Sequence, residues 1–183
     1  MTTDLHATEA RWFAVRVMPR KEKFVRNRLE REGVECYVPL RDKLFKYASK
    51  SGVRQLPLLP SYVFVRIVSD QRITVLRTLY VKYFITLGGQ LRQVTTEEIA
   101  VLRRLSSDTT VDWSPVEEEE LTAGTPVEVI SGPLAGVRGH YVKKKSKQIF
   151  YISLGGLGSC LSTCEIDARI LVPLGAPGAD AER

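Results

Sequence analysis

The chain has 183 residues, of which 44% are hydrophobic and 26% charged, and it carries a formal net charge of +6. This composition is close to the average for globular proteins and argues against a disordered chain. The chain contains no run approaching the roughly 18 uninterrupted apolar residues of a membrane span, and its opening, MTTDLHATEARW, lacks the basic and apolar regions of a secretory signal. We therefore expect a cytoplasmic protein with no membrane contact, built from one or two small domains.

The charge is distributed unevenly along the chain. Residues 1–105 carry 20 Lys and Arg against 10 Asp and Glu, residues 106–120 carry six acids and no base, and residues 121–183 carry 7 bases and 5 acids. The basic first segment indicates either an acidic partner, such as a phosphate backbone, or a merely solvated basic surface. The acidic segment SSDTTVDWSPVEEEE is typical of an exposed linker, because like charges extend a chain. Trp113 within it is large and apolar, so we expect it to dock on a neighbouring surface.

The stretch before the acidic segment alternates strand-like and helix-like patterns. The expected elements are a strand in WFAVRVM from Trp12, a helix at Arg20–Gly33, a strand at Glu35–Leu40, a basic hairpin at Lys43–Pro57, a strand at Ser61–Val68, a short helix at Ile73–Leu79, a strand at Lys82–Leu87, a Gly88-Gly89 turn, and a helix capped by Thr95 or Thr96 that runs from Glu97 to Leu105. This order predicts an α+β domain with helices packed on a mainly antiparallel sheet.

The stretch after the acidic segment contains only short strand patterns. They are TPVEVISG, GVRGHYV, KQIFYISL, SCLST and ARILVPL. Glycine turns or basic loops separate them, which predicts a small all-β barrel. Their β-branched content and glycines disfavour a helical form. We therefore predict a first domain at residues 9–106, an acidic linker at 107–121, a second domain at 122–174 and a disordered tail at 175–183.

The segment VEVISGPLAGVRGHY carries the sharpest local motif, formed by Gly132, Pro133, Gly136 and Gly139. The first two residues end one strand, Gly136 lets the loop turn back, and a glycine inside the next strand indicates a close approach of backbone. This spacing resembles the KOW motif of small SH3-like barrels in transcription and ribosomal proteins.

The first domain supplies an independent resemblance. The opening strand from Trp12, the basic helix, PLLPSYVFVRI and VLRTLYVKYFITLGGQLRQVTTEEIAVL resemble, in this order, the N-terminal (NGN) domain of the NusG family. Ser61 stands where the family usually has glycine. The two resemblances together cover residues 11–105 and 122–173, and RKEK with PLLPSYVF is most similar to the specialised UpxY and RfaH group. The resemblance implies a transcription elongation or antitermination factor that suppresses pausing or termination, in the manner of an operon-specific NusG paralogue.

The resemblance implies that the N-terminal domain binds the clamp helices of the RNA polymerase β′ subunit through an apolar cavity. The residues that match this region are Phe13, Leu59, Pro60, Tyr62, Phe64, Phe84 and Leu87. Aromatic anchors suit the binding of a helix in a groove, although alternate members of a central strand are buried in any protein. Asp70–Thr74 falls where relatives contact the gate loop of the polymerase.

The basic residues of the first domain are the expected nucleic-acid surface. They are Arg16, Arg20, Lys21, Lys23, Arg26, Lys43, Lys46, Lys50 and Arg54. Lys and Arg contacts to phosphates would give salt-dependent binding, and specialised relatives are recruited by non-template DNA or nascent RNA. The alternative for each residue alone is a solvated helix or hairpin face.

In the C-terminal domain, the resemblance implies binding to a small-subunit ribosomal protein or to Rho. Phe150, Tyr151 and Ile152 could form the partner surface and Lys143–Lys147 could meet RNA, or these residues could serve ordinary packing and solvation. A ribosome-associated or RNA-binding KOW protein is the alternative function. It would explain the glycine motif and the basic charge but not the tryptophan-led first domain.

Catalysis and cofactor binding are not expected. The sequence has no phosphate loop, nucleophile elbow or metal-ligand cluster, and the histidines His6 and His140 are isolated. Cys36, Cys160 and Cys164 are odd in number and too few for a four-ligand zinc site, so we expect reduced thiols. The predicted protein is a monomer without metal or cofactor.

Overall fold

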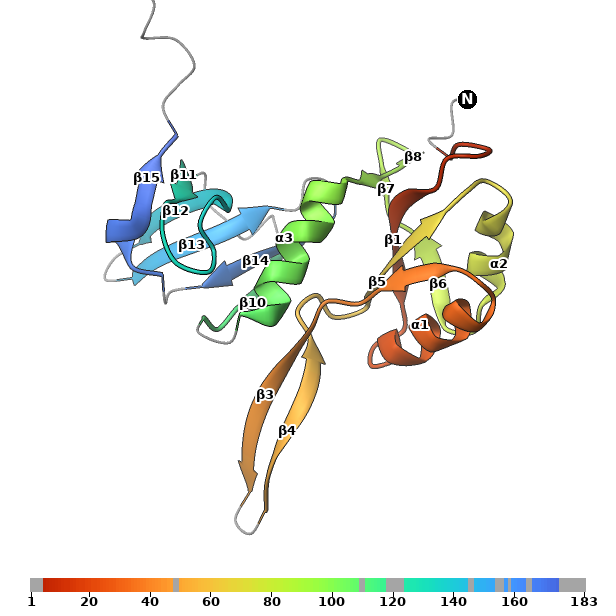
Figure 1. The fold of residues 1–183 in the computed structure, drawn as a ribbon, viewed down its shortest axis with the longest axis horizontal. Helices are drawn as coiled ribbons and strands as arrows, with labels where there is room; N and C mark the ends of the chain where they lie inside the picture. Colours follow the sequence, from red (N-terminus) through yellow and green to blue (C-terminus); the bar gives the residue numbers. More distant parts are fainter. Residues whose placement is uncertain are drawn as a thin grey trace, which may run out of the picture.

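The computed structural model describes residues 5–47, 50–108, 111–117, 124–144, 147–153, 157, 159–163 and 166–174 (Figure 1). In chain order, its elements up to the acidic segment are β1 (Arg11–Val17), α1 (Glu22–Arg31), β2 (Glu35–Tyr37), β3 (Leu40–Tyr47), β4 (Lys50–Pro57), β5 (Tyr62–Ile67), α2 (Gln71–Arg77), β6 (Val81–Phe84), β7 (Thr86–Leu87), β8 (Gln90–Leu91), β9 (Gln93–Val94) and α3 (Thr96–Ser107). The later elements are β10 (Ser114–Glu117), β11 (Thr125–Val129), β12 (Arg138–Lys144), β13 (Lys147–Ser153), β14 (Ser159–Thr163), the 3₁₀ turn η2 (Ala168–Ile170) and β15 (Leu171–Pro173). No helix in these ranges is long and apolar enough to cross a membrane.

Five strands form the N-terminal sheet, in the order β2-β5-β1-β6 with β9 also paired to β1. Every pairing is antiparallel. Because neighbouring residues of a strand point to opposite faces, β1 places Phe13 and Val15 on one face and Trp12 and Ala14 on the other. The first face packs on α1 and α2 and the second on α3, so both faces of the central strands are buried. The α+β organisation predicted from the sequence is confirmed.

The helices follow from their apolar spacing and their ends. Val25 and Leu29, four residues apart, form the buried side of α1. Helix α3 begins at a capping box, in which Thr95 accepts the backbone N–H of Glu98 and the Glu98 carboxylate accepts that of Thr95. Of the two caps that the sequence left open, Thr95 and Thr96, the structure has Thr95. The short helix α2 begins two residues earlier than expected, at Gln71.

Strands β3 and β4 form a separate two-stranded hairpin, here called the basic hairpin. Its ladder runs from the Leu40–Pro57 pair to the Tyr47–Lys50 pair without interruption. The hairpin projects away from both larger sheets (Figure 1). The hairpin predicted at Lys43–Pro57 is confirmed and starts three residues earlier.

The C-terminal sheet has six antiparallel strands, in the order β10-β14-β13-β12-β11-β15. Five of them match the strands predicted from the sequence. The sixth, β10, comes from the acidic segment and pairs with β14 from Ser114 to Glu117. Trp113 precedes it and is buried, as expected for a docked tryptophan. Residues 175–183, the predicted tail, lie outside the described residues.

Candidate functional site

One apolar core joins the two sheets. It contains Trp12, Tyr62 and Phe64 of the N-terminal sheet, the inner side of α3, and Phe150, Ile152 and Leu161 of the C-terminal sheet. Trp113 lies within this core with its ring centroid 6.1 Å from that of Phe150. The C-terminal sheet and α3 therefore cover together the face of the N-terminal sheet opposite α1 and α2.

Tyr62 is the central residue of this interface. Its hydroxyl donates a buried hydrogen bond of 2.8 Å to the carbonyl oxygen of Leu157, which belongs to the C-terminal part of the chain. The Arg16 guanidinium lies 4.6 Å from the centroid of its ring. Arg16 and Tyr62 are direct cross-strand partners in the β1–β5 ladder, which explains the stacking.

The position of Tyr62 depends on the residue before it. Ser61 has φ +67°, a left-handed conformation that is uncommon outside glycine. Its backbone N–H donates a buried hydrogen bond of 2.7 Å to the Glu22 carboxylate of α1, and its carbonyl accepts the N–H of Val17 at 2.9 Å. Two elements thus hold the turn that leads into β5.

A second polar contact joins α3 to the glycine loop of the C-terminal sheet. The Arg104 guanidinium donates to the carbonyl oxygens of Pro133 and Ala135, at 2.9 and 2.6 Å. Gly132 and Gly136 adopt φ values of +81° and +82°, and the Gly136 N–H donates to Val129, which closes the loop. The loop predicted from the KOW resemblance therefore packs on α3 in this arrangement.

The predicted polymerase-binding residues divide between three environments. Leu59, Tyr62 and Phe64 lie in the core beneath the C-terminal sheet. Phe13 and Phe84 contact each other edge-to-face on the opposite face of the sheet, in the core under α1 and α2. Pro60 and Leu87 are exposed. The structure thus gathers three of the seven residues on one covered face, and their role in binding stays a prediction.

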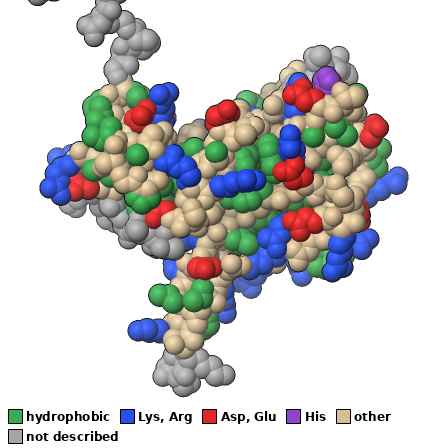
Figure 2. All heavy atoms as spheres, viewed as in Figure 1, with side chains coloured by type: hydrophobic (Ala, Val, Ile, Leu, Met, Phe, Trp, Pro, Cys, Tyr) green, Lys and Arg blue, Asp and Glu red, His purple; other side chains and the backbone are tan. Residues whose placement is uncertain are grey.

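The predicted nucleic-acid residues form two neighbouring groups, with Arg16 at the sheet interface. Four lie on or just before α1, namely Arg20, Lys21, Lys23 and Arg26, and Lys43, Lys46, Lys50 and Arg54 belong to the basic hairpin. The groups meet where Lys23 donates to Gln55 of β4 at 3.2 Å. The side chain of Lys50 is outside the described part. Figure 2 shows basic and apolar side chains together along the hairpin.

The remaining predicted residues belong to the C-terminal sheet. A Cβ on Gly139 would lie 2.5 Å from the Tyr151 carbonyl oxygen and 2.7 Å from the Phe150 ring, so the expected close approach of backbone is confirmed. Phe150 and Ile152 are buried in the shared core, and Tyr151 is buried with its ring stacked 5.0 Å from that of His140. Their proposed role as a partner surface stays a prediction.

Sequence reasoning missed the residues that tie the parts together. Asp112 of the acidic segment pairs with Arg41 of β3 at 2.5 Å and lies 3.8 Å from Lys43. Neither Asp112 nor Arg104 belongs to a motif, because each acts on a partner that is distant in sequence. The two residues of a capping box stand at a fixed spacing in the sequence. Contacts between residues that are distant in the sequence have no fixed spacing by which they could be found.

The described residues contain no group of three or more His, Cys, Asp or Glu side chains that could hold a metal ion. Cys36 is half-buried beside Glu30, and its Sγ donates to the carbonyl of Val34. Burial, and to a lesser extent the Glu30 carboxylate, raises the pKa of the Cys36 thiol to about 12. This cysteine is therefore a packed thiol and not an activated one.

Comparison with protein families identifies the class. The family model described as transcription termination factor NusG matches residues 10–103, just over half of the chain. The chain therefore belongs to the NusG family of transcription factors.

Two solved structures extend the comparison. A structure of NusG from Thermotoga maritima, described as showing domain interaction in that protein, has a TM-score of 0.55 and 21% sequence identity, and the match covers 92% of this chain and 99% of that chain. This similarity shows a shared fold. A structure of the MjSpt4:Spt5 complex, in conformation B, has a TM-score of 0.31 and 20% identity, with 90% and 97% of the two chains covered. No curated protein matches the chain.

Proposed function

We propose that this chain is a cytoplasmic, operon-specific transcription elongation and antitermination factor, close to the UpxY and RfaH group, that acts as a monomer and without catalytic chemistry. It binds the β′ clamp helices of RNA polymerase through its N-terminal sheet and suppresses pausing or termination. Membership of the NusG family supports this proposal. The basic surface contacts non-template DNA or nascent RNA, and the C-terminal sheet, as a KOW barrel, binds a small-subunit ribosomal protein or Rho.

The observation that carries the proposal is the nature of the cover over Tyr62 and Phe64. A sheet face that has no partner to bind can be covered permanently by a helix of the same domain. Here a second sheet supplies much of the cover, and the Tyr62–Leu157 and Arg104–loop hydrogen bonds join it to β5 and α3. When the C-terminal sheet leaves, an apolar face with an aromatic anchor becomes available to a partner helix.

This arrangement has a consequence for binding. Tyr62 cannot contact Leu157 and a polymerase helix with the same hydroxyl and ring surface. Binding through this face therefore requires the sheets to separate, and the measured affinity is the intrinsic affinity reduced by the fraction of separated molecules.

The test is a pull-down with core RNA polymerase. We compare the wild type with Tyr62→Ala and use Phe24→Ala as the matched control, because Phe24 is an exposed aromatic on α1, on the other side of the sheet. Circular dichroism first establishes that each variant is folded. We expect Tyr62→Ala to lose polymerase while Phe24→Ala retains it.

Two results would contradict the proposal. Equal binding by Tyr62→Ala and the wild type would exclude this face as the contact. If the wild type fails to bind polymerase and copurifies with ribosomal subunits, a ribosome-associated or RNA-binding KOW protein becomes the better explanation.

A further inference from the structure

Exposed apolar side chains lie between α1 and α2, on the side of the N-terminal sheet away from α3 (Figure 1). Phe24 of α1 is 48% exposed and Leu79, just after α2, is 60% exposed. Both line a groove with a volume of about 460 Å³, here called the α1–α2 groove, and its polar lining includes Arg28, Arg77 and Thr78. This volume lies in the range of sites that hold a ligand. An exposed apolar patch with a polar rim is typical of an interaction site.

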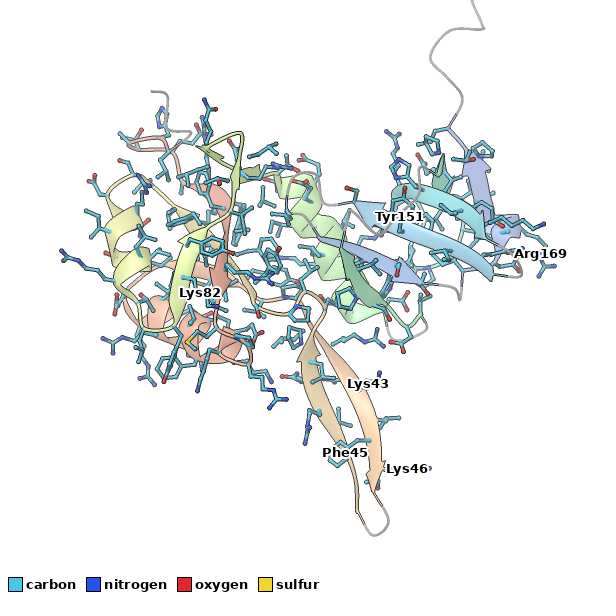
Figure 3. All side chains as sticks on the ribbon, turned by 180° about the vertical axis from the view of Figure 1, so that it is seen from behind. Lys43, Phe45, Lys46, Lys82, Tyr151 and Arg169 are labelled. Atoms are coloured by element: carbon cyan, nitrogen blue, oxygen red, sulfur yellow. The ribbon has the colours of Figure 1, made fainter. Side chains whose placement is uncertain are left out.

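A strained turn presents Leu79 to the groove. The Val81 N–H donates to the carbonyl oxygen of Thr78 at 3.1 Å. Tyr80, the third residue of this turn, has φ +74°, a conformation that glycine normally supplies at this position. Figure 3 labels Lys82 on β6, the strand that begins at the end of the turn.

Contacts from α1 hold Tyr80 in this conformation. The Tyr80 ring meets the Phe24 ring edge-to-face, with centroids 5.2 Å apart, and the Lys21 ammonium lies 4.7 Å from its centroid. The carbonyl oxygen of Tyr80 accepts the N–H of Met18 at 2.9 Å. A bulky residue keeps such a backbone conformation only where its surroundings enforce it, and such residues are found mostly at functional sites. The α1–α2 groove is therefore a preformed feature of the domain.

The surface around the groove is basic. Residues 18–32 carry six Lys or Arg and three Glu, a net charge of +3, and residues 70–82 carry three Lys or Arg and one Asp, a net charge of +2. At the groove itself, Arg28 is paired with Glu32 at 2.9 Å. Arg77 is exposed and makes no ion pair with any residue that the structure describes. Charge complementarity therefore favours an acidic partner.

We propose that the α1–α2 groove is the docking site of an acidic amphipathic helix of a partner protein. Such a helix presents apolar anchors at positions i, i+3 or i+4 and i+7 on one face. It can place an anchor between Phe24 and Leu79 and a carboxylate beside Arg77. The groove and the face that holds Tyr62 lie on opposite sides of the N-terminal sheet, so this partner and polymerase can be bound together. The proposal thus adds a second protein partner to the proposed function.

The chemistry of the groove disfavours a nucleic acid as its occupant. Leu79, and Leu76 at 41% exposure on α2, have neither hydrogen-bonding side-chain atoms nor a ring on which a base could stack. Aliphatic side chains gain stability by being removed from water, which a phosphate backbone does not provide. A protein segment with apolar anchors satisfies these side chains and the cations together.

The test selects helical peptides on the immobilised full chain, without polymerase. The probe is a library of peptides of about 15 residues, long enough to form a helix, with leucine at the anchor positions and Glu, Gln or Lys at the flanking positions. We expect glutamate to be enriched at the flanks. Selection on Arg77→Glu should lose this enrichment, because the cation that favours it has been replaced by an anion.

Fluorescence anisotropy then measures the affinity of a selected peptide for variants of the chain. We expect Phe24→Ala and Leu79→Gln each to weaken binding about tenfold or more, as the loss of an interface anchor does. Ile130→Gln is the matched control, because Ile130 is 56% exposed just after β11 of the C-terminal sheet. It should change the affinity less than about twofold, as a residue outside the interface does.

Three results would overturn the proposal. They are a selection that enriches no peptide, a selection that favours lysine at the flanks, and peptides that bind Leu79→Gln as tightly as the wild type. A short DNA duplex whose binding Leu79→Gln weakens as strongly would also overturn it and make nucleic acid the occupant. Leu79 is exposed, so Leu79→Gln stays informative even if Phe24→Ala disturbs Tyr80. Because polymerase is absent, this proposal and the pull-down can each fail while the other holds.

Discussion

At the scale of single residues, Ser61 holds a backbone conformation that glycine adopts more easily. A left-handed conformation costs an ordinary residue roughly 1–2 kcal/mol, and glycine loses about 0.5–1 kcal/mol through the greater freedom of the unfolded chain. We therefore expect Ser61→Gly to raise the free energy of unfolding by about 0.5–1 kcal/mol, and Ser61→Ala, which keeps the strain at φ +67°, not to raise it. Thermal unfolding of the three proteins measures this. A lower Tm for Ser61→Gly than for Ser61→Ala would contradict it.

Glu22 supports the same turn from α1. Its carboxylate accepts the buried N–H of Ser61 at 2.7 Å, and the Glu22 side chain is itself buried. Removing one partner of a buried hydrogen bond leaves the other unsatisfied, at a cost of about 1–3 kcal/mol. We expect Glu22→Ala to lower the free energy of unfolding by that amount in urea titrations. Glu30→Ala, at an exposed position of the same helix, is the control and should change it by less than about 0.5 kcal/mol.

The Cys36 thiol provides a prediction about pH. Because burial raises its pKa to about 12, the reactive thiolate is scarce in the folded chain throughout the neutral and mildly alkaline range. Iodoacetamide at pH 8 should leave Cys36 unmodified in the folded protein and modify it after unfolding in urea, as read by mass spectrometry of the peptide. Rapid modification of Cys36 in the folded chain would show that the thiol is not held as described.

At the scale of elements, two glycines of the C-terminal sheet are needed for different reasons. Gly139 faces the Tyr151 carbonyl and the Phe150 ring, so a methyl group there forces strands β12 and β13 apart. Gly132 has open space around its Cα but a φ of +81°. We expect Gly132→Ala to cost about 1 kcal/mol of strain and Gly139→Ala clearly more, on the scale of overpacking at about 1–3 kcal/mol. Equal free energies of unfolding for the two variants, measured in urea titrations, would contradict this order.

The elements that could be predicted from the sequence are those with local signals. The alternation from Trp12 predicted β1, and a threonine cap followed by glutamates predicted the start of α3. Strand β10 was missed because Ser114–Glu117 carries proline and acid, and it is a strand only because β14 offers it a ladder. Tertiary context overrides local propensity most strongly at such edge positions.

The candidate site could be predicted only in part, for the same reason. The motifs named Tyr62 and the glycine loop, but the Tyr62–Leu157 bond joins residues 95 positions apart. Side-chain contacts at such separations leave no periodic trace in the sequence. Likewise, alternation placed Phe13 and Phe64 in strands but did not reveal that they lie on opposite faces of the N-terminal sheet, in separate cores.

At the scale of the whole molecule, the apolar face that should bind polymerase is shared between the two sheets. The closed arrangement is stabilised by the common core and by hydrogen bonds from Tyr62 and Arg104. A typical hydrogen bond contributes about 0.5–1.5 kcal/mol net, so losing one should raise the ratio of separated to closed molecules by roughly two- to tenfold. Weakening the interface should therefore increase polymerase binding, whereas damaging the face itself should abolish it.

The most direct measurement is the affinity of the full chain for core RNA polymerase with two substitutions at one residue. Tyr62→Phe removes the hydroxyl that bonds Leu157 and keeps the ring, whereas Tyr62→Ala removes both. We predict that Tyr62→Phe binds about two- to tenfold more tightly than the wild type and that Tyr62→Ala binds much more weakly. If Tyr62→Phe and Tyr62→Ala both bind as the wild type does, the covered face of the N-terminal sheet is not the polymerase-binding surface.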